Sequence, residues 1–128
     1  MTSTLIATED DLQVQVASFL NVALPDGCIF HHSPNEGKRH VSYINRLKRL
    51  GTNWGWPDLE LFCPQNTTSS GHNEAIFIEL KIKRGRLTAN QETMRDLLRN
   101  AGFSWGLCKS VEDVYLFLKP LVHLRAIM

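Results

Sequence analysis

The stretch Ala75-Ile76-Phe77-Ile78-Glu79-Leu80-Lys81-Ile82 is the clearest strand in the sequence. Successive side chains of a strand point to opposite faces. The three isoleucines and Leu80 therefore share one face, while Phe77, Glu79 and Lys81 share the other. The aliphatic face is expected to join an apolar core. The other face carries two charged groups beside a phenylalanine, and we expect it to be partly covered.

A second strand is predicted at Asp58-Leu59-Glu60-Leu61-Phe62-Cys63, where Asp58, Glu60 and Phe62 share a face. The turn-like Trp54-Gly55-Trp56-Pro57 precedes it, and a polar loop at residues 64–74 joins it to the strand at 75–82. If the two strands are neighbours, Asp58 and Glu79 point from one sheet face toward the same spot.

Apolar periodicity and capping residues predict the remaining elements. They are a helix from the Thr8 N-cap to about Leu24, a strand at Cys28–Phe30 leading to His31, His32 and a turn-like loop at 33–37, a basic helix at Lys38–Leu50, a helix from Thr88 to about Ala101, a strand at Ser104–Cys108 and a helix from Ser110 to about Leu118. This order predicts an α/β fold with a mixed central sheet flanked by helices.

The length and the charge distribution limit the possibilities. A chain of 128 residues with 43% hydrophobic content is expected to form a single domain over residues 1–128. The net charge of +1 hides an uneven distribution, because residues 1–37 hold five acids and no lysine or arginine, whereas residues 38–86 hold nine basic residues and four acids. A basic central window suits a phosphate-rich partner such as DNA.

The cysteines and the N-terminus favour a cytoplasmic protein. Cys28, Cys63 and Cys108 are an odd number in apolar segments, which favours buried reduced thiols. The N-terminal residues lack a basic region followed by a long apolar run, and no stretch is long enough to span a bilayer. We therefore expect neither secretion nor a membrane partner.

Two carboxylates and a lysine form the strongest chemical pattern: Pro57-Asp58, twenty intervening residues, then Glu79-Leu80-Lys81. Converging carboxylate oxygens suit Mg²⁺ or Mn²⁺, and the backbone carbonyl of Leu80 is a candidate further ligand. Such a metal supplies charge neutralisation and an activated water for phosphodiester hydrolysis. Lys81 would orient or deprotonate that water, or stabilise transition-state charge. We favour orientation and charge stabilisation, because two neighbouring carboxylates favour the protonated ammonium.

Several blocks in this order resemble the virus-type replication-repair nuclease (VRR-NUC) domain of the PD-(D/E)xK superfamily. The resemblance runs from about Glu9 to Leu118. It rests on His32-Ser33-Pro34-Asn35-Glu36-Gly37-Lys38-Arg39, Leu50-Gly51 with Gly55-Trp56-Pro57-Asp58, Ile78-Glu79-Leu80-Lys81, Gly85-Arg86-Leu87-Thr88 with Gln91, and Leu98 with Ala101-Gly102. It implies a restriction-endonuclease-like core and action on DNA, with branched DNA such as Holliday junctions as the substrate and a bacterial or phage-infected cell as the setting.

The resemblance also assigns roles to residues. It implies metal ligands at Asp58 and Glu79, a catalytic lysine at Lys81, a first-helix acid at Glu9 and an active-site glutamine at Gln91. Glu9 has neighbours of the same type at positions 10 and 11, and acids at a helix N-terminus are favoured by the helix dipole alone. Gln91 also completes a capping box with Thr88, so its role is open between structure and chemistry.

The predicted DNA-binding residues surround these positions. A glycine-containing loop that enters a basic helix offers both amides and positive charge to phosphates. The set is His32, Asn35, Lys38, Arg39, Lys48, Arg49, Lys83 and Arg84. A zinc site at Cys28, His31 and His32 is disfavoured, since the sequence has no second Cys/His cluster with ligand spacing. Trp54 and Trp56 are typical of core residues more than of base-stacking platforms.

Three functions remain in competition at this point: an endonuclease on branched DNA, an endonuclease on linear duplex of the restriction or phage-packaging type, and a non-catalytic DNA-binding module. Resolving a four-way junction requires two nicks, which favours a homodimer. The apolar tail at Leu121, Val122, Leu124, Ile127 and Met128 is a candidate interface, with packing on the chain's own core as the alternative.

Overall fold

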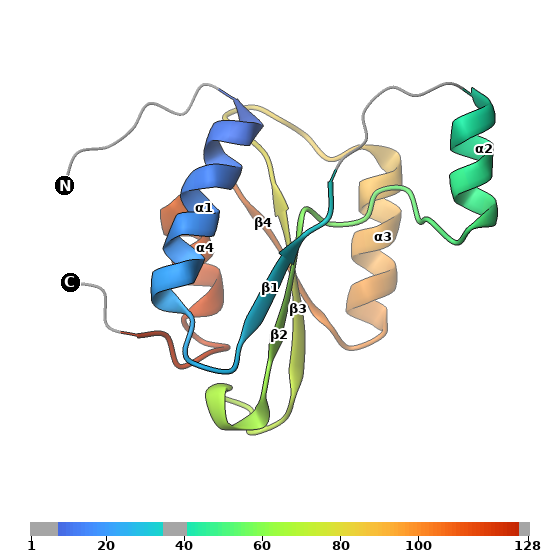
Figure 1. Cartoon of the computed structure of the whole chain (residues 1–128). Coiled ribbons are helices and arrows are strands. Elements are labelled where there is room, and N and C mark those ends of the chain that lie inside the picture. Colours follow the sequence, from blue (N-terminus) through green and yellow to red (C-terminus); the bar gives the residue numbers. More distant parts are fainter. Residues whose placement is uncertain (1–7, 35–40, 126–128) are drawn as a thin grey trace.

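A computed structural model describes residues 8–34 and 41–125 of the chain (Figure 1). The elements follow the order α1 (Glu9–Ala23), β1 (Ile29–His32), α2 (Val41–Arg49), β2 (Leu59–Cys63), the 3-10 helix η1 (Gln65–Thr67), β3 (Glu74–Leu80), α3 (Ala89–Asn100), β4 (Ser104–Cys108) and α4 (Val111–Leu118). Apart from the short η1, this is the predicted order of helices and strands. The α/β class is confirmed.

The four strands form one sheet in the order β1-β2-β3-β4. The first three strands are antiparallel neighbours, and β4 runs parallel to β3 after the crossover through α3. The sheet is therefore mixed, as predicted. In the β2–β3 register Leu59 lies opposite Ile78, so Asp58, one residue earlier, comes beside Glu79.

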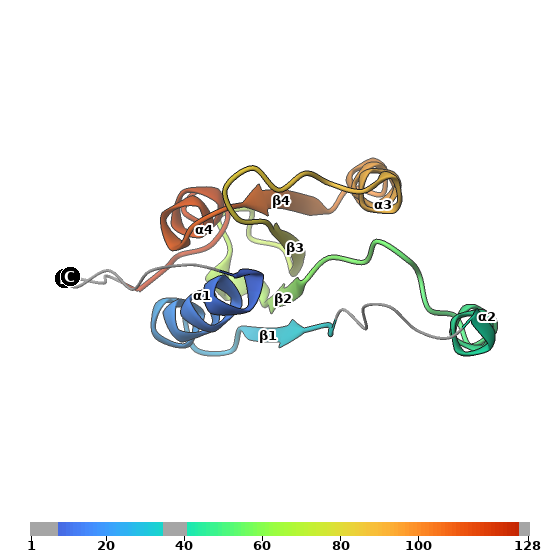
Figure 2. The ribbon, with the colours of Figure 1, turned by 90° about the horizontal axis from the view of Figure 1, so that it is seen from above.

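Helices α1 and α4 cover one face of the sheet, and α3 lies on the opposite side (Figure 2). The apolar face predicted for 75–82 points at α1 and α4, where Ile76, Ile78 and Leu80 are buried. Gly106 in β4 allows α4 to approach closely, because a Cβ there would lie 2.8 Å from the Phe117 ring. This layer forms the larger core.

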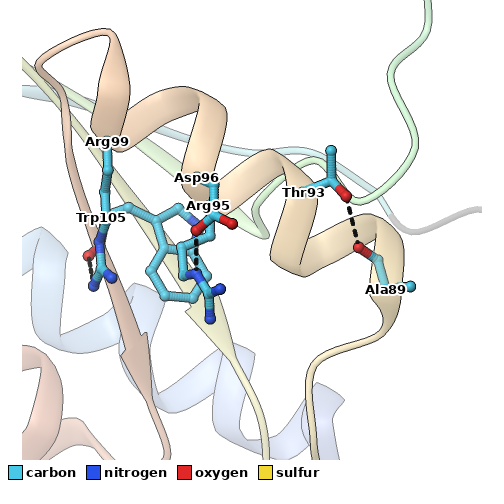
Figure 3. A network of polar contacts seen from close by, with 6 residues as sticks. All are labelled: Ala89, Thr93, Arg95, Asp96, Arg99 and Trp105. Carbon is cyan, nitrogen blue, oxygen red and sulfur yellow. Dashed lines mark hydrogen bonds and ion pairs between the residues drawn. The ribbon is translucent and has the colours of Figure 1, made fainter.

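The second face of β3 is buried as well, because α3 packs over it. Phe77 lies among Met94 and Leu98 of α3 and Trp105 of β4 in a smaller apolar cluster. Arg99 connects α3 to β4. Its Nη2 donates a hydrogen bond to the Trp105 carbonyl at 3.1 Å, and its guanidinium lies over the Trp105 indole (Figure 3). Burial on both faces explains why Glu79, in the same strand, is only 2% exposed.

Two polar contacts in Figure 3 lie within α3. Arg95 Nε pairs with Asp96 Oδ1 at 2.9 Å, and Thr93 Oγ1 donates to the Ala89 carbonyl at 3.0 Å. The ion pair lies at the surface, where such pairs contribute little to stability. The packing of α3 therefore depends on its apolar face and on Arg99.

Helix α2 stands away from both layers, on the same side of the sheet as α3 (Figures 1 and 2). Its Ile44 and Leu47 are half-buried, and Leu50, just beyond its end, is 70% exposed. The predicted basic helix began at Lys38, but residues 38–40 lie outside the described part of the chain. Both boundaries of the preceding strand differ from the prediction, because β1 runs from Ile29 to His32 and the predicted strand was Cys28–Phe30.

The described part of the C-terminal tail packs on the chain's own core. Val122 is buried and bridges to Thr68, while Leu121 and Leu124 pack against the same cluster. Ile127 and Met128 lie outside the described residues. Val122 is therefore unavailable to the predicted homodimer interface, whereas Leu121 and Leu124 remain half-exposed beside the chain's own core.

The three cysteines are free thiols. Cys63 and Cys108 are buried, and burial raises the pKa of each thiol to about 12. Cys28 is half-buried and its Sγ donates to Thr67 Oγ1 at 3.3 Å. No helix in the described part of the chain is both long and apolar enough to cross a membrane.

Candidate active site

Asp58 and Glu79 meet where β2 begins and β3 ends. Asp58 Oδ2 accepts a hydrogen bond from the Leu80 amide at 2.7 Å, which ties the first carboxylate to the strand that carries the second. The pKa of Glu79 is raised to about 9, mostly by burial and in addition by the hydrogen bond and negative charge of the neighbouring Asp58 carboxyl. In the metal-free site, Glu79 therefore holds a proton at neutral pH.

Lys81 lies one residue beyond the end of β3, although it was predicted inside the strand at 75–82, and it is 9% exposed. Its positive charge lowers the pKa of Glu79, against the larger effect of burial, so the ammonium lies within electrostatic reach of the carboxyl. The backbone then turns sharply: Lys83 has a φ of 42°, and the Gly85 amide donates to the Ile82 carbonyl at 2.7 Å. Lys109 Nζ braces this turn by donating to the Lys83 carbonyl at 2.9 Å.

Gln91 makes both of the contacts that the sequence left open. Its Oε1 accepts a hydrogen bond from the Thr88 backbone amide at 2.9 Å, and its backbone amide donates to Thr88 Oγ1 at 3.2 Å, which completes the capping box of α3. Its Nε2 donates to Glu79 Oε2 at 3.2 Å. The side chain thus links the first turn of α3 to the carboxylate cluster.

Of the three acids at the start of α1, Glu9 is the one whose charge reaches Glu79, whose pKa it raises slightly. Asp11 is committed to the helix itself, because its Oδ2 accepts from the Thr8 amide at 3.1 Å in a capping box. Glu9 is exposed at the first position of α1. Glu9 thus has an electrostatic effect on the site, and its role as an active-site acid stays a prediction.

The donor set fits a hard divalent cation. Glu79 Oε1 is buried and has no hydrogen-bond partner among the described residues. Leaving a buried carboxyl oxygen without a partner is costly unless a ligand completes it. The described residues contain no cluster of three or more His, Cys, Asp or Glu side chains arranged for a metal. Mg²⁺ often uses only one or two carboxylates together with water, so Asp58 and Glu79 meet its requirement.

A cleft of about 420 Å³ opens beside Asp58. Its lining comes from the end of β1, from α2, from the loop before β2 and from α3: Ser33, Pro34, Leu47, Gly51, Thr52, Asn53, Trp54, Gly55, Trp56, Asp58, Glu60 and Gln91. The cleft thus connects the carboxylate cluster to solvent. One lining residue, Leu47, comes from α2, the helix that stands apart from the sheet.

Three hydrogen bonds fix the entrance of the cleft. The Asp58 carbonyl accepts from the Ser33 amide at 3.0 Å and lies 2.9 Å from His32 Nδ1, while Ser33 Oγ donates to Glu60 Oε1 at 2.9 Å. Gly55 lets the loop before β2 touch α3, because a Cβ there would lie 2.3 Å from the Asn90 carbonyl oxygen. Ser33, Glu60 and this role of Gly55 were not predicted, although the alternation of Asp58 and Glu60 had placed both on one face.

The predicted DNA-binding residues fall into three places. Lys48 and Arg49 are exposed on α2, next to Leu47, which lines the cleft, and Lys83 and Arg84 are exposed at the turn after Lys81. His32 is exposed at the end of β1. The remaining three, Asn35, Lys38 and Arg39, lie outside the described residues.

Comparison with known proteins identifies the family. The sequence model of the VRR-NUC domain family matches residues 8–112 of this chain. A solved structure described as a VRR_NUC domain protein superposes with a TM-score of 0.68 at 22% identity, covering 91% of this chain and 88% of that one. No curated protein sequence matches this chain. The family match spans both carboxylates, Lys81, Gln91 and Glu9, and the fold agrees, so the chain belongs to the VRR-NUC family of nuclease-type domains.

Proposed function

We propose that this domain is a structure-specific DNA endonuclease that requires Mg²⁺ or Mn²⁺ and hydrolyses phosphodiester bonds in branched DNA such as Holliday junctions. The observation that carries the proposal is the meeting of Asp58 and Glu79, with an unpartnered buried oxygen on Glu79, at the edge of an open cleft. A non-catalytic binding module has no physical need for two acids facing phosphate, one of them buried.

The two carboxylates would hold the cation, with the Leu80 carbonyl as a candidate third ligand. When bound, the cation supplies neutralisation of phosphoryl charge and activation of the attacking water. Lys81 orients that water and stabilises the charge that develops on phosphorus-bound oxygens. Gln91 fixes the rotamer of Glu79 through its 3.2 Å hydrogen bond, and Glu9 adds a negative charge at the rim of the site.

DNA would be held by exposed basic residues of α2 and of the turn after β3. Lys48 and Arg49 on α2 and Lys83 and Arg84 after β3 would contact phosphates near the reacting bond, together with His32 and the predicted Asn35, Lys38 and Arg39. Such contacts position the duplex without reading its sequence, which agrees with a structure-specific enzyme.

The test is a cleavage assay with end-labelled four-way junction, flap and linear duplex, each with Mg²⁺, Mn²⁺ or EDTA. We expect metal-dependent cleavage of the branched substrates and little cleavage of the linear duplex. Equal cleavage of the linear duplex would favour a restriction or packaging type of nuclease. Binding without cleavage in any metal would contradict the proposal and favour the binding module.

We further propose a homodimer, because two opposed nicks in one junction require two copies of the Asp58–Glu79 site. Sedimentation at micromolar concentration measures the state directly. A monomer that nicks a single strand would refute the resolvase activity and leave the nuclease standing. The free thiols of all three cysteines agree with a reducing compartment, and we place the enzyme in the cytoplasm of a bacterial or phage-infected cell.

A further inference from the structure

The cleft beside Asp58 has a mixed lining. Asp58, Glu60 and Gln91 contribute polar groups, from the start of β2 and from α3. Pro34, Leu47 of α2 and Trp54 contribute apolar ones. Its volume of about 420 Å³ falls in the range of small-molecule sites, and a lining that combines apolar and polar side chains suits a planar group with a polar edge.

Trp54 and Trp56 are only two residues apart but differ in their surroundings. Trp56 packs edge-on against Phe77, with ring centroids 5.6 Å apart, and so belongs to the smaller core. Trp54 is half-buried, and within residues 8–34 and 41–125 its ring has no stacking partner and no hydrogen bond. A large apolar ring left open in a cleft is more readily explained by a ligand than by packing.

The charges around the cleft indicate what kind of ligand fits. Arg46, Lys48 and Arg49 are exposed on α2, whose Leu47 lines the cleft, whereas Asp58 lines it at the start of β2. A nucleotide matches this arrangement, since its base can stack on Trp54, its backbone can continue toward the basic helix, and its neighbouring phosphate can lie over Asp58 and Glu79. Stacking on an aromatic ring needs a free base face, which a base inside a duplex does not offer.

We propose that the cleft binds the base of an unpaired DNA nucleotide next to the scissile phosphate, with Trp54 as its stacking platform. The proposal rests on the nuclease function above and narrows its substrate class: DNA that presents an unpaired or easily unpaired nucleotide at a branch is bound productively, and continuous duplex is not. Trp54 then selects DNA structure by the accessibility of a base, without reading which base it is.

The experiment uses a flap substrate that carries 2-aminopurine in the single-stranded arm, moved base by base away from the branch point, and a blunt duplex with the same analogue in a paired position. Binding is measured with Ca²⁺ in place of Mg²⁺, so that the signal does not depend on cleavage. The variants are Trp54→Ala and Trp54→Phe, with thermal melting of each to establish that it is folded.

We expect 2-aminopurine fluorescence to be quenched at one or two positions beside the branch and nowhere in the blunt duplex. Trp54→Ala should remove the quenching and weaken flap binding about tenfold, while Trp54→Phe keeps most of both, because an aromatic ring still stacks. Binding of the blunt duplex should change less than twofold in either variant.

The two proposals fail in different ways. Metal-dependent cleavage without position-specific quenching, or quenching unchanged in Trp54→Ala, would overturn the base pocket and leave the nuclease intact. Quenching that depends on Trp54 without cleavage in any metal would support the pocket and overturn the nuclease.

Discussion

The two faces of β3 differ in what they bury: one buries apolar side chains, and the other buries ionisable ones. Toward α1 and α4, Ile76, Ile78 and Leu80 are fully or almost fully buried among other apolar side chains. Toward α3 and the cleft, Glu79 is buried to the same degree but keeps an oxygen without a partner, and Lys81 lies beside it. Burial stabilises the first face and costs free energy on the second. A cost retained at this position is expected to serve chemistry.

Two isosteric substitutions at the carboxylates should separate the roles of the two faces, chemistry and stability, most strongly. Asp58→Asn and Glu79→Gln keep the shape of each side chain but remove the charges that hold a divalent cation. Single-turnover cleavage of a labelled junction in Mg²⁺ should fall at least about a thousandfold in either variant. Melting temperatures should not fall. Wild-type rates in either variant would place the metal elsewhere.

The matched control is the adjacent residue on the other face. Ile78→Val removes one buried methylene group from the larger core, so we expect a loss of about 0.5–1.5 kcal/mol in the free energy of unfolding. Its cleavage rate at a temperature where it is folded should stay within twofold of wild type. If Ile78→Val lost activity as severely as Glu79→Gln, the faces would not be separable and the assignment of Glu79 to chemistry would lose its support.

Lys81 tests whether the charge beside the carboxylates acts on the transition state or on DNA binding. Lys81→Ala removes one of several basic groups near the site. Lys81 is buried, whereas Lys83 and Arg84 are exposed. We expect a loss of roughly 10²- to 10³-fold in single-turnover rate and less than threefold in affinity for the junction. Lys83→Ala is the control at the exposed turn and should affect affinity more than rate. Equal losses in both quantities for Lys81→Ala would assign it to binding.

Sequence patterns found the elements and the centre of the site because each carries a local signal. The period-two alternation of 75–82 fixed which side chains of β3 share a face, and Thr8, Thr88 and Ser110 marked three helix starts that the structure confirms as N-caps. The position of α2 and the contacts of Ser33 and Gly55 had no such signal. They depend on contacts between segments that are far apart in the sequence, such as the loop before β2 and α3, and a local pattern does not encode such contacts.

The cost of burying Glu79 predicts an unusual dependence of stability on pH. Its pKa is about 9 in the metal-free fold and near 4.3 in an unfolded chain, so between these values the folded state binds more protons than the unfolded state. Stability from this group is therefore full below about pH 4.3 and is lost as pH rises toward 9, by up to about 1.4 kcal/mol per pH unit.

Chemical denaturation of metal-free wild type and Glu79→Gln from pH 5 to pH 9 measures this contribution, because other titrating groups cancel in the difference. The variant should gain stability relative to wild type as the pH rises. Adding Mg²⁺ at pH 8 should raise the melting temperature of wild type and leave that of Glu79→Gln unchanged. A constant difference across the pH range would mean that Glu79 ionises in the fold without cost.

The smallest effect separates the two contacts of Gln91, one to each region. Glutamate at this position can still accept the Thr88 amide hydrogen bond and preserve the cap of α3, but it replaces the amide donor to Glu79 with a second acid. Gln91→Glu should therefore keep the wild-type melting temperature within a few degrees and lower the cleavage rate about ten- to a hundredfold, the usual loss when a partner of a metal ligand is removed. Gln91→Ala removes both contacts and should lose about 1 kcal/mol of stability as well. Differential scanning fluorimetry and single-turnover kinetics on the same preparations compare the two quantities. If both variants cut at the wild-type rate, the hydrogen bond to Glu79 has no part in catalysis, and Gln91 serves only to begin α3.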